Sequence, residues 1–192
     1  MPTNREPLAV VILAAGKGTR MKSDIPKMLH PLLGKPILGY VLETARSMRP
    51  QKSLLVVGHQ AKLLVEAFRS WPGVFVKQSP QLGTGHALKM AQREMKGFQG
   101  TVLVLYGDVP LIEKGTLKKM LQVHKKEKAV LTLISTNVAY PKGYGRIIRD
   151  TQRRLLKIVE EKDASPQERQ LQEINTGLYC FDSGFLLSSL SK

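Results

Sequence analysis

The chain has 192 residues, of which 42% are hydrophobic and 23% charged, and its formal net charge is +15. This length and mixture suit a soluble globular chain of one domain, or of one domain with a small subdomain. A single cysteine, Cys180, excludes an internal disulfide, and no cysteine and histidine spacing matches a zinc site. The longest apolar run near the start, residues 8–15, is far shorter than the roughly 20 residues of a membrane-spanning helix. We therefore expect a cytoplasmic location and no membrane partner.

The excess of basic residues leaves several kinds of partner open. Basic surfaces attract nucleic acids, anionic membranes and phosphorylated small molecules, and they can equally be plain solvated surfaces. One lysine cluster lies on a predicted amphipathic helix, whose apolar stripe is Leu117, Met120, Leu121 and His124. We expect His124 at the edge of the core. Because no aromatic residues are interleaved with the lysines, stacking on bases has no support and no nucleic-acid partner is expected.

Strand and helix signals alternate through the first 140 residues. Residues 7–13 form a short apolar run rich in β-branched residues, which is typical of a strand buried on both faces. Further elements are predicted in chain order: a helix over 37–48, a strand over 53–57, a helix over 61–68, a strand over 74–76, a helix over 84–95, a strand over 101–106, a helix over 114–127 and a strand over 129–136. This rhythm predicts the α/β class, with a Rossmann-like, mostly parallel sheet flanked by helices.

The pattern changes after Pro141. Short strands are predicted over 146–149, 155–159 and 178–181, with little helix between them, and a helix is predicted to begin at residue 183. We expect these strands to be antiparallel additions, after residue 140, at one end of the sheet.

The first strand leads into a glycine-rich segment. It reads Leu13-Ala14-Ala15-Gly16-Lys17-Gly18-Thr19-Arg20-Met21. Small residues let the backbone approach a ligand, free N–H groups can hold phosphates, and Lys17 and Arg20 add positive charge. The third glycine of a dinucleotide fingerprint is missing, and Gly34-Lys35 is followed by proline, which excludes a Walker A loop. The residues alone leave a phosphate-binding loop and an ordinary turn about even, although Lys27 adds a further cation shortly afterwards.

This segment, followed by x-Pro-Lys, resembles the signature of nucleotidyltransferases that make NDP-sugars. The closer resemblance is to the uridyltransferase domain of the bifunctional enzyme that makes UDP-N-acetylglucosamine, and it runs from Leu8 to about Phe185. The further motifs, in order, are Gln78-Ser79-Pro80-Gln81-Leu82-Gly83-Thr84-Gly85-His86-Ala87, Leu105-Tyr106-Gly107-Asp108-Val109-Pro110-Leu111, Gly143-Tyr144-Gly145-Arg146-Ile147, Ile158-Val159-Glu160-Glu161-Lys162-Asp163-Ala164 and Glu173-Ile174-Asn175-Thr176-Gly177. The resemblance implies the nucleotide-diphospho-sugar transferase fold and two substrates, UTP and N-acetylglucosamine 1-phosphate. It also implies a role in UDP-N-acetylglucosamine biosynthesis, which serves cell-wall, peptidoglycan and lipopolysaccharide synthesis.

The resemblance also assigns roles to individual residues. The residues that it places on the nucleotide are Leu13, Ala14, Ala15, Gly16, Lys27, Gln78, Gly83, Thr84, Tyr106 and Gly107. The residues that it places on the sugar nucleotide are Asp108, Gly145, Glu160 and Asn175. It implies Mg²⁺ as the cofactor, held by Asp108.

For three of these motif residues, the position in the sequence does not by itself decide the role. Asp108 ends an apolar strand, where a metal ligand and a helix N-cap are equally suited. Glu160 belongs to a run of charged residues that would otherwise be interpreted as a solvated surface. His86 lies inside the start of a predicted helix, and we expect it to be structural and not a catalytic base.

The expected chemistry needs no protein nucleophile. A sugar 1-phosphate is already anionic, and the sequence shows no convincing nucleophile–base set. We expect in-line attack on the α-phosphorus, with Mg²⁺ on Asp108 bridging the phosphates. Arg20 and Lys27 are the predicted catalytic residues, because they would neutralise charge on the triphosphate.

The family pattern extends beyond this chain. The related uridyltransferase domain continues past residue 192 with an asparagine that completes the metal site, and the left-handed β-helix acetyltransferase domain follows. We expect one nucleotidyltransferase domain over residues 1–192, shortened at its C-terminus and lacking acetyltransferase activity. Two alternatives stay open: a nucleotide-binding module with little or no catalysis, and a pyrophosphorylase for a different sugar 1-phosphate. The oligomeric state is also open, a homo-oligomer included.

Overall fold

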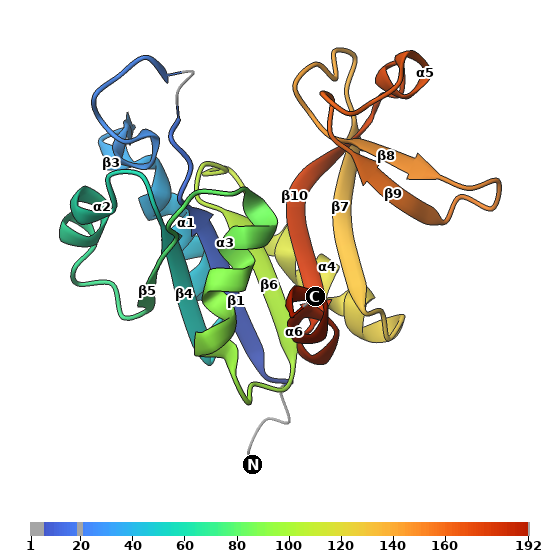
Figure 1. Cartoon of the computed structure of the whole chain (residues 1–192). Helices are drawn as coiled ribbons and strands as arrows, with labels where there is room; N and C mark the ends of the chain where they lie inside the picture. The colour runs from blue at the N-terminus through green and yellow to red at the C-terminus, as the bar shows by residue number, and fades with distance from the viewer. Residues whose placement is uncertain (1–5, 19–20, 192) are drawn as a thin grey trace. The chain divides into compact units, whose positions relative to one another are not determined.

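The computed structural model describes residues 6–18 and 21–191, which form parts of two compact units (Figure 1). Unit 1 is built from residues 1–132 and 180–192, and unit 2 from residues 133–179. The predicted catalytic residue Arg20 lies outside the described residues.

A parallel sheet forms the centre of unit 1. Its strands lie in the order β5 (Val74–Lys77), β4 (Lys52–Val57), β1 (Leu8–Ala14) and β6 (Thr101–Tyr106), and each neighbouring pair is parallel. Residues 9–12 of β1 are completely buried, because the strand has neighbours on both sides and helices on both faces. Continuous apolar runs are what such a strand requires. The predicted mostly parallel α/β sheet is therefore confirmed.

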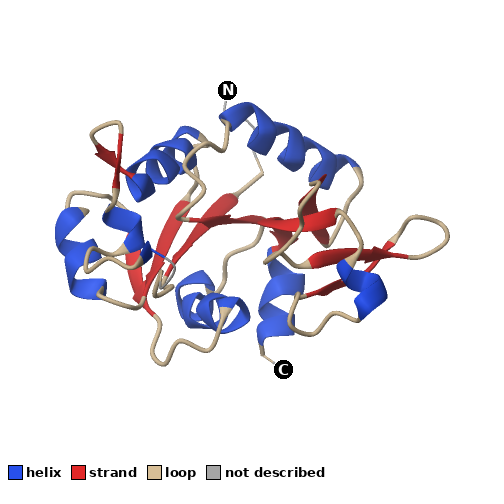
Figure 2. Cartoon of the chain, turned by 90° about the horizontal axis from the view of Figure 1, so that it is seen from above, coloured by secondary structure: helices blue, strands red, loops and turns tan. Residues whose placement is uncertain are grey.

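Helices cover both faces of this sheet (Figure 2). Figure 1 shows α3 and α6 in front of the sheet and α1 and α4 behind it. The helices of unit 1 are α1 (Ile37–Ser47), α2 (Ala61–Ala67), α3 (Thr84–Ala91), α4 (Lys114–Lys126) and α6 (Ser183–Leu190), together with 3₁₀ turns η2 (Lys27–Leu29) and η3 (Gln92–Met95). A small hairpin of β2 (Pro31–Leu32) and β3 (Lys35–Pro36) precedes α1. Over the described residues, every helix is too short or too polar to cross a lipid bilayer.

Helix α4 shows why the amphipathic pattern predicts burial. Leu117, Met120 and His124 face the core, while the lysines between them are exposed. The His124 side chain is 4% exposed, and its Nδ1 lies 2.9 Å from the Thr132 hydroxyl. Burial lowers the pKa of His124, against a smaller opposing effect of Glu6 and Asp182. This position confirms His124 as a residue of the core edge.

Unit 2 is antiparallel. Strand β8 (Arg146–Arg149) pairs with β9 (Leu155–Val159) and with β10 (Glu173–Asp182), and both pairs are antiparallel. Strand β7 (Leu131–Asn137) and β10 each run from one unit into the other. The predicted antiparallel strands after residue 140 are therefore confirmed.

Several elements differ from the sequence prediction. Strand β10 begins at Glu173 and not at residue 178, because it pairs with β8 at Ile174 and also with β7, although Asn175 and Gly177 are residue types that disfavour strands by themselves. Helix α5 (Pro166–Arg169) was not predicted, although its capping box of Ser165 and Glu168 is visible in the sequence. The helix predicted over residues 84–95 continues as a 3₁₀ turn from residue 92.

The stability of unit 2 is expected to depend on pH through Glu173. Two hydrogen bonds from the Arg149 guanidinium, at 2.8 and 2.6 Å, and one from the Ser135 hydroxyl lower the pKa of Glu173 from 4.5 to about 2. Because the folded state holds the ionised form, this contribution is complete above pH 4.5 and is lost as the pH falls towards 2.

Replacing Glu173 by glutamine should therefore flatten the dependence of stability on pH. We would measure the free energy of unfolding by urea titration at intervals from pH 5 to about 2.5. The control is Glu127→Gln, which alters an exposed carboxylate at the end of α4. If the free energy of unfolding of Glu173→Gln falls with pH as steeply as that of the control, Glu173 is not the source of the pH dependence.

Candidate functional site

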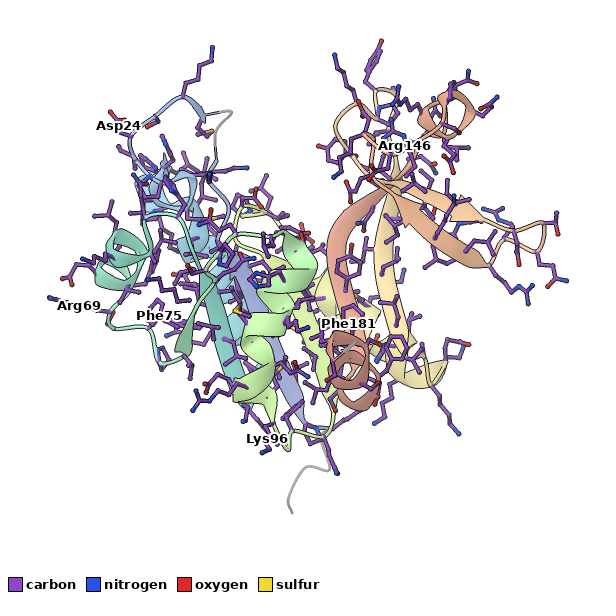
Figure 3. All side chains as sticks on the ribbon, viewed as in Figure 1. Asp24, Arg69, Phe75, Lys96, Arg146 and Phe181 are labelled. Carbon is purple, nitrogen blue, oxygen red and sulfur yellow. The ribbon has the colours of Figure 1, made fainter. Side chains whose placement is uncertain are left out.

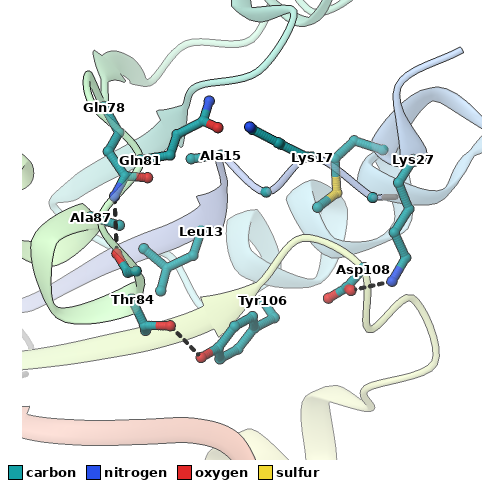
Figure 4. Close-up of a pocket in the computed structure, with 14 residues that line it drawn as sticks. Leu13, Ala15, Lys17, Lys27, Gln78, Gln81, Thr84, Ala87, Tyr106 and Asp108 are labelled. Carbon is teal, nitrogen blue, oxygen red and sulfur yellow. Dashed lines mark hydrogen bonds and ion pairs between the residues drawn. The ribbon is translucent and has the colours of Figure 1, made fainter. Parts of the chain in front are cut away.

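A hollow of about 410 Å³ lies at the carboxyl ends of the strands of unit 1 (Figure 4). Open α/β sheets bind their ligands at this edge. Its walls come from the end of β1 with the glycine-rich segment, from η2, from the end of β6, and from the loop that leads into α3. The lining residues are Leu13, Ala15, Gly16, Lys17, Gly18, Lys27, Met28, Gln78, Gln81, Gly83, Thr84, Ala87, Tyr106 and Asp108.

One end of the pocket is charged. The Lys27 ammonium nitrogen lies 2.5 Å from an Asp108 carboxylate oxygen, and the two side chains are 34% and 27% exposed. Lys27 opens the 3₁₀ turn η2 directly after the buried Pro26, whereas Asp108 follows β6. A partly exposed pair such as this contributes little to stability because water screens it. Its cation and carboxylate therefore stay available to a ligand, with Lys17 on the same wall.

The other end is uncharged. The Gln78 side chain is 4% exposed and its amide nitrogen donates to the Gly83 carbonyl at 2.9 Å. The Thr84 hydroxyl lies 3.2 Å from that of Tyr106, linking the start of α3 to the end of β6. Gly83 is the N-cap residue of α3 with no side-chain cap bond, so the first N–H groups of this helix lie beside the pocket. Amides and hydroxyls of this kind suit the polar edge of a base and the hydroxyls of a ribose.

Most residues predicted for the nucleotide line this single pocket. Ala14 and Gly107 do not line it but pack behind it, and a Cβ built on Gly107 would lie 3.3 Å from that of Ala14. Met28, Gln81 and Ala87 line the pocket without having been predicted. Gln81 and Ala87 lie inside the quoted motif of residues 78–87, which was the available signal, whereas nothing in the sequence singled out Met28.

Three of the four residues predicted for the sugar nucleotide, Gly145, Glu160 and Asn175, converge in unit 2, whereas Asp108 lies in the pocket of unit 1. The Asn175 N–H donates to the Gly145 carbonyl at 2.9 Å, and a Glu160 carboxylate oxygen lies 3.2 Å from where a Cβ on Gly145 would be. The Asn175 amide nitrogen donates to the Tyr179 hydroxyl, and its oxygen accepts from the Gly177 N–H. This pairing holds the amide in place and leaves one donor and one acceptor position unused by these bonds.

Arg146 organises the loop beside this cluster (Figure 3). Its guanidinium donates to the Tyr144 carbonyl and, at 3.2 Å, to the Arg169 carbonyl, and it lies 3.5 Å from the Glu161 carboxylate. That carboxylate also accepts from the Gly143 N–H. The Gly143 hydrogen bond, followed by the charge of Arg146, lowers the pKa of Glu161. These contacts tie the loop of residues 143–145 to the segment that carries Glu160.

Asp108 fits the predicted magnesium ligand by its chemistry. Mg²⁺ takes hard oxygen ligands and is usually held by one or two carboxylates together with substrate phosphates and waters. Within the described residues, no group of three or more histidine, cysteine, aspartate or glutamate side chains is assembled to hold a metal. The Asp108 carboxylate, beside Lys27 in the pocket, would suit an ion that arrives with a triphosphate. The Mg²⁺ assignment itself stays a prediction.

Gly18 joins the glycine-rich segment to Lys27, which makes its replacement informative. Its φ is +61°, which disfavours residues with a side chain, and an added Cβ would lie 2.8 Å from the Cβ of Lys27. We expect Gly18→Ala to destabilise the protein by about 1–2 kcal/mol and to displace Lys27. Displacement of a positioning group by an ångström lowers turnover by about 10²-fold.

The matched control is Gly115→Ala in α4, where an added Cβ meets nothing within 4 Å. It should raise stability by about 0.5–1 kcal/mol and leave turnover unchanged. Both variants are compared by urea unfolding and by pyrophosphate release. Equal turnover in Gly18→Ala and wild type would show that the glycine-rich segment does not position Lys27.

A pocket at the carboxyl edge of a parallel sheet is the arrangement in which open α/β folds bind their ligands. The chain belongs to the family of MobA-like NTP transferase domains, whose model matches residues 10–173. Two relatives are each called bifunctional protein GlmU. That of Pelobacter propionicus is 47% identical over 186 residues, covering 96% of this chain and 40% of its own length. That of Geobacter metallireducens is 48% identical over 186 residues, covering 96% of this chain and 39% of its own length. The chain thus spans about 40% of the length of these relatives.

Solved structures share the fold. A UDP-glucose pyrophosphorylase complexed with UDP-glucose superposes with a TM-score of 0.75 at 21% identity, covering 97% of this chain and 80% of its own. HddC from Yersinia pseudotuberculosis, complexed with GMP-PN, superposes with a TM-score of 0.69 at 25% identity, covering 92% of this chain and 77% of its own. Together with the sequence relatives, these structures confirm the predicted family and fold.

Proposed function

We propose that this chain joins UTP and N-acetylglucosamine 1-phosphate to give UDP-N-acetylglucosamine and pyrophosphate. The observation that carries the proposal is the division of one pocket into an uncharged end with Gln78 and Gly83 and a charged end with Lys27 and Asp108. A nucleoside triphosphate has the same division between its base and its phosphates. The ordered motifs and the identity to bifunctional protein GlmU over 96% of this chain support uridine and the amino sugar.

The proposed reaction depends on alignment of the reactants and on neutralisation of charge, and it needs no covalent intermediate with the protein. An oxygen of the acceptor phosphate attacks the α-phosphorus, a new P–O bond forms, and the bond to the β-phosphate breaks, so that pyrophosphate leaves with its electron pair. The acceptor oxygen is already ionised, so no proton has to be removed. The Lys27 ammonium group would neutralise negative charge on the phosphates. Alignment of the two reactants would account for much of the rate acceleration.

Magnesium would add charge neutralisation at the phosphates, and Asp108 is the residue that would hold it. Arg20, the second predicted catalytic cation, is proposed for the same electrostatic role on the strength of the motif alone. Gly145, Glu160 and Asn175 are proposed to bind the sugar. Their convergence in unit 2 supports this assignment, because a carboxylate and an amide together can pair with hydroxyl and N-acetyl groups. A cytoplasmic location and a role in supplying cell-envelope sugars belong to the same proposal.

The test is a matrix of substrates with Mg²⁺ and this chain. Each of UTP, CTP, ATP, GTP and dTTP is combined with N-acetylglucosamine 1-phosphate, glucose 1-phosphate or galactose 1-phosphate. Released pyrophosphate and the nucleotide sugar are measured together. We expect the highest kcat/KM for UTP with N-acetylglucosamine 1-phosphate.

The other outcomes each overturn the proposal in a distinct way. Preference for glucose 1-phosphate or galactose 1-phosphate would make the chain a pyrophosphorylase for another sugar. UTP binding without product from any acceptor would make it a nucleotide-binding module. A comparable preference for another triphosphate would refute the assignment of uridine.

A further inference from the structure

The buried polar group at the uncharged end of the pocket is the amide of Gln78. Its nitrogen has two hydrogens and two neighbours, the Gly83 carbonyl at 2.9 Å and the His86 Nδ1 at 3.1 Å. His86 lies in the first turn of α3 and is not among the residues that line the pocket. The amide is therefore held by a residue that is not part of the pocket lining.

The Gly83 carbonyl decides which way the amide points. It also accepts from the Ala87 N–H at 3.1 Å, which fixes it in the first turn of α3. A reversed Gln78 amide would bring two acceptor oxygens against each other. The nitrogen must therefore face Gly83, and Figure 4 shows the amide oxygen turned the other way, towards the open part of the pocket.

His86 takes the second hydrogen of the same nitrogen. Because that nitrogen can only donate, Nδ1 of His86 must accept, and the ring proton of a neutral His86 must sit on Nε2. With both hydrogens engaged, the amide has no donor left for a ligand and presents only its oxygen. This arrangement supports the structural role predicted for His86.

We propose that His86 is a positioning residue that selects the base through Gln78. The Gly83 carbonyl sets the direction of the amide, and His86 adds a second acceptor for the same nitrogen, which helps to hold the amide oxygen towards the ligand as an acceptor. Uracil offers a donor, N3–H, at its pairing edge, whereas cytosine offers an acceptor, N3, at the same place. The inference rests on the proposed function and explains how the pocket would choose UTP over CTP, because buried polar groups reject a ligand that leaves them unpaired.

The experiment compares kcat and KM for UTP and CTP in three proteins. His86→Phe keeps a ring but removes the acceptor, and should lower the ratio of kcat/KM for UTP over CTP by about 3- to 10-fold, the value of one hydrogen bond. The loss should appear mainly in KM. His86→Asn can place a carbonyl oxygen near the position of Nδ1, and should restore the ratio.

A Gln78→Ala background separates positioning from a general effect on folding. If His86 acts through Gln78, adding His86→Phe to Gln78→Ala should leave the UTP to CTP ratio unchanged. An equal change in both backgrounds, or an unchanged ratio in His86→Phe with Gln78 intact, would overturn the inference. Should His86→Phe not fold, His86→Ala serves in the same comparison.

Failure of this inference is distinguishable from failure of the proposed function. Wild-type protein that does not turn over UTP refutes the proposed function. Wild-type protein that prefers UTP, together with a His86→Phe variant that keeps the full preference, refutes only the role of His86.

Discussion

Replacing Asp108 by alanine is expected to lower the rate of pyrophosphate release by about 10³-fold. Removal of one preorganised electrostatic group from a reaction centre costs about 10²–10³-fold, and a group that also holds a metal ion contributes at least as much. Asp108 is the carboxylate that faces Lys27 in the pocket, so the variant would also leave this lysine without its partner at 2.5 Å.

Folding should hardly change in Asp108→Ala. The Asp108 and Lys27 side chains are 27% and 34% exposed, and partly exposed ion pairs contribute less than about 1 kcal/mol. We would measure kcat with saturating UTP, Mg²⁺ and sugar 1-phosphate, and the free energy of unfolding in parallel. The control is Asp163→Ala, which alters a side chain that is 66% exposed in unit 2. Turnover within threefold of wild type would show that Asp108 does not take part in the reaction.

Replacing Arg146 by leucine is expected to destabilise unit 2 by about 3–5 kcal/mol. The Arg146 side chain is 2% exposed, and its removal takes the guanidinium donor from the carbonyls of Tyr144 and Arg169 and the ion-pair partner from Glu161, which keeps only the Gly143 N–H. Breaking a buried charged network by removing one member costs several kcal/mol. Among residues 6–18 and 21–191, the Arg146 Nε is buried without a hydrogen-bond partner, so its loss offsets a small part of this cost.

The control for Arg146→Leu is Arg154→Leu. Arg154 belongs to the same unit and contacts Asp150 at 2.7 Å, but its side chain is 73% exposed, so less than about 1 kcal/mol should be lost. Arg146→Lys should not rescue stability, because an ammonium cannot reproduce the planar fork of a guanidinium. The free energy of unfolding of all three variants is measured by urea titration. An Arg146→Leu variant within 1 kcal/mol of wild type would show that the network is dispensable.

The class of fold and most of its elements follow from the sequence alone. The strand over residues 8–14 has an unbroken apolar run, and such a run is stable only between two neighbouring strands and two layers of helix. The stripe on α4 predicted the burial of His124 because a helix repeats every 3.6 residues. Asp108 could likewise be placed at a strand end, since the apolar run stops just before it.

The local sequence pattern does not predict the structure where contacts between distant residues determine it. Residues 173–177 lack a strand pattern, yet they form the first half of β10, which pairs with β8 at Ile174 and also with β7. The structural role of Arg146 was equally invisible. A sequence pattern does not show that an arginine inside a strand will be enclosed by carbonyls of residues 144 and 169.

The α/β class, the order of the elements, the family and the residues from which a nucleotide site could be built can all be inferred from the amino-acid sequence. Which of those residues come into contact follows from the folding of the whole chain. Lys27 and Asp108 are 81 positions apart, and Gly145 and Asn175 are separated by a hairpin and α5. Local periodicity fixes helices and strands because their hydrogen bonds and buried faces repeat along the chain. Contacts between distant residues depend instead on strand register and packing, which no short stretch of sequence specifies.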